Sequence, residues 1–263
     1  MKRIAVVAIY TLSSLLGLLA FADPFLRPVV LSAGGAAKAS YARATEAPLL
    51  TVGLLLLCLV ALFVEMQGQA TNAKVIAALG VLVAITAVLR FLETAVPGPG
   101  GFSPVFVPII LTGYVFGSRF GFLMGALSLL VSALLTGGVG PWLPFQMFTA
   151  GWIGLTAGWL PHLSRPGLEM VLLIFFGFLW GLLYGAITNL YFWPFLVGES
   201  GLSWQAGDGW QTAIAHYAAF YLATSLVWDI FAAAGNSLLL VVLGRPILQA
   251  LARFQARFQF QVV

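Results

Sequence analysis

Charged side chains are scarce in this chain, since Asp, Glu, Lys and Arg make up only 8% of its 263 residues. Soluble globular domains carry about 25% charged residues, so this scarcity excludes a soluble globule. Hydrophobic residues make up 61% of the sequence, and the stretch from 101 to 161 has no acidic residue. We therefore expect an all-α polytopic membrane protein.

The residues and motifs of familiar enzymes and metal sites are also missing. The single cysteine, Cys58, excludes an internal disulfide and a thiolate metal cluster. The two histidines, His162 and His216, fall on opposite sides of the predicted membrane. The sequence lacks the G-x-x-x-x-G-K-[ST], G-x-S-x-G and H-E-x-x-H motifs. We expect no enzymatic activity, no cofactor, and no ATP bound by this chain through a P-loop.

Eight apolar runs, a few of them short, nearly fill the chain, and a helix needs about 20 mostly apolar residues to span a bilayer. The runs cover residues 4–22, 48–65, 73–92, 103–117, 119–136, 142–161, 168–193 and 211–243. The first run also fits a cleavable signal, because it follows Lys2 and Arg3 and ends in a small-x-small pattern. The apolar core of a cleavable signal has about 7 to 15 residues. The apolar part of this run is longer, so we favour an uncleaved span.

The predicted organisation has three parts. Residues 1–72 hold two additional transmembrane helices and a linker, residues 73–244 form a six-helix core, and residues 245–263 form a cytoplasmic amphipathic tail. We expect that tail to lie on the anionic inner leaflet. The glycine-rich turns at residues 117–119 and 136–142 should face opposite sides, because only the first carries a cation.

The basic residues indicate the orientation, because Lys and Arg in short loops collect on the cytoplasmic side. From residue 73 onward Arg90 alone falls outside. The basic residues inside are Lys74, Arg119, Arg165, Arg245, Arg253 and Arg257. Both termini are therefore predicted to be cytoplasmic. The net charge of +4 reflects this topology better than nucleic-acid binding, which requires basic clusters interleaved with aromatics.

Small side chains recur on one face of the predicted span 73–92, at Ala73, Ala77, Gly80, Ala84 and Ala87. Such a stripe permits close backbone approach between membrane helices. Two interpretations stay open, namely packing within the chain and a docking groove for a partner protein. Similar stripes occur at Gly177, Gly181 and Gly185, and from Gly121 to Thr136, where internal packing is favoured.

The predicted span 103–117 is short and contains Pro104 and Pro108, and broken helices are tolerated in membranes where they line a cavity. The preceding loop, 93–102, with Glu93 and Phe102, is interpreted as a lid or as a plain connection. Candidate pocket residues on the same outer side are Trp142, Phe145, Gln146, Asn189, Tyr191, Trp193, His216 and Tyr217. An interfacial aromatic belt is the favoured explanation for each individual Trp and Tyr, so Gln146, Asn189 and His216, which a belt does not require, are the stronger candidates.

Asp229 is the one acidic residue deep within a predicted span, and a carboxylate in lipid costs several kcal/mol. Asn236 lies two turns further along the same face. We interpret the pair as a polar contact with another helix that has a structural or gating role. Proton coupling through Asp229 is the alternative.

Several stretches together resemble the substrate-binding S components of energy-coupling factor (ECF) transporters. They are the Ala73-x-x-x-Ala77 spacing, the Pro-Gly-rich residues 97–101 before the short span, the run G-P-W-L-P-F-Q-M ending at Met147, and residues 229–236 with Leu-Gly-Arg-Pro246. The resemblance covers residues 73–258. The two N-terminal spans depart from the six-span pattern of that family.

The resemblance implies that the chain captures a vitamin or related micronutrient from outside a prokaryotic inner membrane. It implies docking through the first core helix on a transmembrane coupling subunit, which two ATPase subunits drive. Two alternatives remain, a stand-alone carrier coupled to protons through Asp229 and a structural membrane protein without a ligand. The sequence does not name the ligand.

Overall fold

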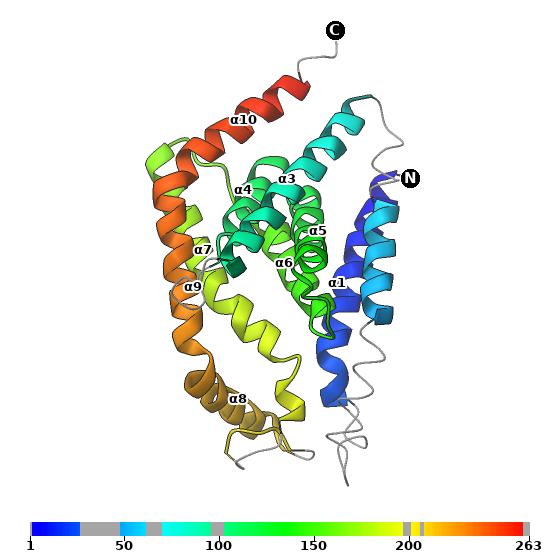
Figure 1. Ribbon diagram of the computed structural model, residues 1–263, viewed down its shortest axis with the longest axis vertical. Helices are drawn as coiled ribbons and strands as arrows, with labels where there is room; N and C mark the ends of the chain where they lie inside the picture. Colours follow the sequence, from blue (N-terminus) through cyan, green and yellow to red (C-terminus); the bar gives the residue numbers. More distant parts are fainter. Residues whose placement is uncertain are drawn as a thin grey trace.

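The computed structural model describes residues 2–26, 48–61, 70–95, 103–196, 201–205 and 208–259, and these residues form helices without any strand (Figure 1). Within them, five helical stretches are long and apolar enough to cross a membrane. They are Val7–Phe25, Lys74–Phe91, Ser118–Thr136, Pro166–Phe195 and Leu226–Ala256. The all-α polytopic membrane fold expected from the composition is therefore confirmed.

Two helices precede the core, in agreement with the predicted spans 4–22 and 48–65. They are α1, Lys2–Leu26, and the helix Pro48–Ala61; residues 62–65 lie outside the described residues. The two lie side by side at one edge of the bundle in Figure 1, and a Cβ placed on Gly53 would lie 3.9 Å from Leu16. Of the core helices, α1 packs mainly on α6, and its Tyr10 ring also meets the Phe122 ring of α5.

The first five core helices follow the predicted spans closely. They are α3, Ala70–Ala95; α4, Phe106–Phe116; α5, Ser118–Thr136; α6, Leu143–Ala157; and α7, Pro166–Asn189. Gly117 joins α4 to α5 with φ of 92°, and Gly137 ends α5 with φ of 69°. Only glycine adopts such angles readily. The two glycine-rich turns flank α5 and therefore stand at its opposite ends.

The short helix α4 is enclosed by the rest of the bundle. It has only 11 residues, and Ile109, Ile110 and Leu111 at its centre are fully buried. Pro108 lies in its first turn, where a missing backbone donor costs nothing. The predicted span 103–117 is thus a short apolar helix that the surrounding protein covers, as a helix too short for a bilayer requires.

The predicted span 211–243 is wrong as a single helix. It consists of α8, Trp210–Thr224, and α9, Leu226–Leu239, with the break at Ser225, and α8 turns away from the α9 axis in Figure 1. Asn189 donates a hydrogen bond of 2.6 Å from Nδ2 to the Ser225 hydroxyl. A contact from another helix therefore marks the break, which no proline or glycine signals.

The C-terminal helix α10, Arg245–Gln259, continues from α9 through the π-helical turn Leu240–Gly244. Its apolar residues Leu248 and Leu251 are buried, and α10 contacts α3 and α4. Gln255 donates a 2.7 Å hydrogen bond to the Val115 carbonyl in the last turn of α4. Leu248 and Leu251 of this tail thus pack on the chain's own bundle, while Arg253 is exposed. Contact of the tail with the inner leaflet stays a prediction.

Candidate functional site

Two of the three small-residue stripes are filled by the chain's own helices. A Cβ on Gly181 would overlap the Ala233 backbone, and one on Gly177 would meet Leu240, so the α7 stripe packs on α9 and the turn that follows it. A Cβ on Gly121 or Gly125 would overlap backbone atoms of α6. Internal packing of these two stripes, which the sequence analysis favoured, is what the structure has.

The stripe on α3 differs, because most of it is uncovered. Ala77, Gly80 and Ala84 are exposed, and a Cβ on Gly80 would meet no atom within 4 Å. Ala87, at the far end of the stripe, is fully buried. Ala73 belongs to α3, but its side chain lies outside the described residues. Three small residues of α3 therefore form a bare face that the described chain leaves open.

Several predicted pocket residues form pairs of neighbouring aromatic rings. The rings of Phe145 and Tyr191 have centroids 4.8 Å apart, and those of Trp193 and Tyr217 are 4.9 Å apart. Trp193 is 2% exposed and donates a 2.9 Å hydrogen bond from Nε1 to the Leu202 carbonyl. We call Phe145, Tyr191, Trp193 and Tyr217 the outer aromatic cluster, after the side of the membrane that the sequence predicts for them.

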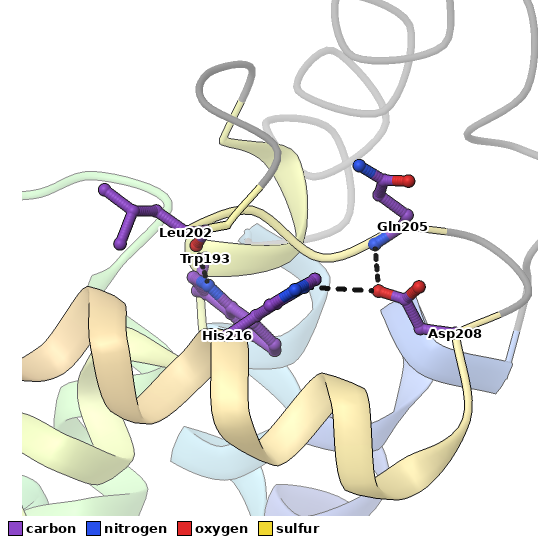
Figure 2. Close-up of polar contacts among 5 residues, drawn as sticks. All are labelled: Trp193, Leu202, Gln205, Asp208 and His216. Carbon is purple, nitrogen blue, oxygen red and sulfur yellow. Dashed lines mark hydrogen bonds and ion pairs between the residues drawn. The ribbon is translucent and has the colours of Figure 1, made fainter.

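A histidine and an aspartate border this cluster (Figure 2). His216 Nδ1 lies 3.5 Å from Asp208 Oδ2, and the side chains are 22% and 16% exposed. The Gln205 backbone N–H donates to the same carboxylate oxygen at 3.1 Å. Asp208 is thus the neighbour of His216.

The remaining predicted pocket residues are spread around the cluster. Asn189 is half-buried and bonded to Ser225, and Gln146 is half-buried on the first turns of α6. Trp142 is 45% exposed, and its Nε1 donates to the Gly138 carbonyl at 3.2 Å. Phe102 lies outside the described residues. Trp142 therefore lies at the surface, as an interfacial aromatic would.

Glu93 lies two residues beyond the apolar span Lys74–Phe91. It accepts a 2.8 Å hydrogen bond from the Ser103 hydroxyl, which ties the end of α3 to the start of the next segment. Burial raises the pKa of the Glu93 carboxyl above its ordinary value, against the smaller opposing effects of the Ser103 hydrogen bond and the Arg90 charge.

Sequence reasoning did not identify Arg90 and Tyr184 as neighbours of Glu93. Arg90 and Glu93 both act electrostatically on the hydroxyl of Tyr184 on α7, and the Tyr184 ring lies 4.6 Å from that of Phe106. Arg90 precedes Glu93 by three residues on the same helical face. The spacing of Arg90 and Glu93 could have indicated a pair of charged residues at this end of α3. The sequence analysis used Arg90 only to orient the chain.

Asp229 and Asn236 both face α7. A Cβ on Gly185 would overlap the Asp229 carboxylate, and one on Gly177 would lie 3.9 Å from the Asn236 Cβ. Asn236 is fully buried, and within the described residues neither of its amide atoms has a hydrogen-bond partner. The described residues contain no group of three or more His, Cys, Asp or Glu side chains that would hold a metal ion.

No curated protein and no solved structure matches the chain. A family model described as "ECF transporter, substrate-specific component" matches residues 74–244. That range begins in α3, ends at the π-helical turn before α10, and leaves α1 and the helix Pro48–Ala61 outside it. It also contains the bare α3 face and the outer aromatic cluster. The chain therefore belongs to the family of substrate-specific components of ECF transporters.

Proposed function

We propose that this chain captures a vitamin or related micronutrient for an ATP-driven importer of the ECF type. Its family is one of transporter substrate-binding components and not an enzyme family. The chain has no P-loop motif, so separate ATPase subunits supply the energy, acting through a transmembrane coupling subunit. We place the protein in the inner membrane of a prokaryotic cell, with both termini in the cytoplasm.

The bare face of α3 is the observation that carries this proposal. Membrane helices associate through small residues that let two backbones approach, and the described chain fills its other two stripes with its own helices. Leaving Ala77, Gly80 and Ala84 exposed suits a helix that receives another subunit. We assign the docking role to these three residues and to Ala73.

Substrate binding is assigned to the outer end of the bundle. The outer aromatic cluster supplies flat apolar surfaces, while Gln146, Asn189, His216 and Glu93 supply hydrogen-bonding groups. Binding sites for small organic molecules combine these two kinds of surface. Trp142 and Phe102 complete the proposed set of contacts. We assign Asp229 and Asn236 a structural or gating role between α9 and α7.

The test is co-expression of the chain with coupling and ATPase subunits, followed by purification and vitamin uptake into proteoliposomes. We expect a complex, a small molecule retained in its native mass spectrum, and uptake that stops when the P-loop lysine of the ATPases is replaced. Failure to bind any member of a vitamin panel, together with failure to co-purify with the other subunits, would overturn the proposal.

A further inference from the structure

The N-terminal helix α1 lies outside the range that matches the family, yet it fits closely against α6. A Cβ on Gly17 would come within 2.8 Å of the Phe148 and Trp152 rings, so only glycine lets the two helices approach this closely. One turn later, the Phe21 ring lies 4.9 Å from that of Phe145 and 5.9 Å from that of Trp152. The helix is therefore fitted to the family core.

Phe25 extends this contact to the outer end. Its ring lies 5.9 Å from that of Trp193 and meets the Trp204 ring edge-on at 5.7 Å. Trp193 stands in the short 3-10 helix Trp193–Phe195, and Trp204 stands in the segment 201–205. One side chain of α1 thus contacts two tryptophans that the chain separates by eleven positions.

Of the two tryptophans, Trp193 belongs to the proposed binding end. Trp193 donates its indole N–H to the Leu202 carbonyl, and its ring meets the Tyr217 ring at 4.9 Å. Tyr217 follows His216 directly in α8. The contacts run from Phe25 through Trp193 to the first turns of α8.

We infer that α1 is a positioning element of the substrate-binding end, and that Phe25 fixes Trp193 and the segment 201–205 in place. The substrate part of this inference rests on the proposed function. The positioning part rests only on the ring contacts and the close approach at Gly17. It assigns the N-terminal helix to the outer site rather than to the coupling subunit.

Amide hydrogen exchange on the full chain in lipid nanodiscs tests the inference without any substrate. We expect Phe25→Ala to speed exchange in residues 201–205 and 210–217 by about tenfold, because two ring contacts are lost together. Exchange in α5 should stay unchanged. Phe25→Tyr, which keeps the ring, should restore slow exchange. The matched control is Leu19→Ala, since Leu19 is 60% exposed on the same helix.

Two outcomes would overturn the inference. In the first, Phe25→Ala leaves exchange in residues 201–205 at the Leu19→Ala level. In the second, exchange rises equally throughout α5 and α6, which would make α1 a general stabiliser. Co-purification with the coupling subunit gives a further readout, which Phe25→Ala should leave unchanged. The exchange result holds whether or not any vitamin binds, so its failure is distinguishable from failure of the proposed function.

Discussion

Gly80→Leu separates docking on α3 from the stability of the chain. A Cβ at Gly80 meets no atom within 4 Å, so a leucine fits there without moving any described neighbour. Replacing a glycine inside a helix also removes a conformational cost of about 0.5 to 1 kcal/mol. The isolated variant should therefore unfold at the wild-type temperature or slightly above it.

The same substitution should weaken assembly. If a coupling helix lies against Gly80, the leucine side chain occupies the space of its backbone. Overpacking of a close contact costs about 1 to 3 kcal/mol, which corresponds to about 5- to 150-fold weaker binding. Co-purification of the coupling and ATPase subunits, measured against subunit concentration, gives this ratio.

Ile85→Phe provides the matched control for this prediction. Ile85 is 50% exposed on the same helix, and it points about 100° away from Ala84 at 3.6 residues per turn. This variant enlarges an exposed side chain outside the small-residue stripe and should assemble normally. Wild-type assembly of Gly80→Leu would refute the docking argument. A large loss of stability in the isolated variant would show that the chain itself covers this face.

Three further substitutions test other parts of the structure. Gly154→Ala places a Cβ onto the Gly121 backbone, so we expect it to destabilise the chain by about 1 to 3 kcal/mol, and an unchanged melting temperature would contradict the packing. Asp229→Asn should leave uptake dependent on the ATPases; uptake by the wild-type chain alone, lost in this variant, would instead favour the proton-coupled carrier. Burial raises the Glu93 pKa, so its contribution to stability is most favourable below its ordinary value of about 4.3 and declines as pH rises through the folded value. Glu93→Gln should remove that decline from thermal melts recorded against pH, and identical profiles for both proteins would argue against it.

The predictable parts of the fold are those that local sequence controls. Gly117 and Gly137 carry positive φ angles that favour glycine, and Pro104 and Pro108 stand at the start of the short α4. The break at Ser225 depends on no such signal, since its partner Asn189 lies 36 residues away. Contacts of this kind arise only when the helices assemble.

In the candidate site, too, the sequence indicated residue types but not the contacts between distant segments. Asn189, Trp193 and His216 were predicted from residue type and depth. In the structure His216 belongs to α8, Trp193 meets the Tyr217 ring of α8, and Asn189 bonds to Ser225 at the end of α8. Their partners Ser225, Leu202 and Asp208 were not predicted as contacts. The aromatic contributions of α1 were missed because residues 1–72 were interpreted as additional helices outside the core. Spacing along one helix does not reveal which ring from a distant segment faces it.

The bond from Gln255 to the Val115 carbonyl has a consequence for the end of α4. The last four carbonyls of a helix have no partner within it, and Gln255 of α10 satisfies one of these carbonyls from 140 residues away. A chain cut before Arg245 would leave the Val115 carbonyl without this partner. A polar group that loses its partner without gaining water costs about 1 to 3 kcal/mol, so the last helix of the chain helps to end a helix near its middle.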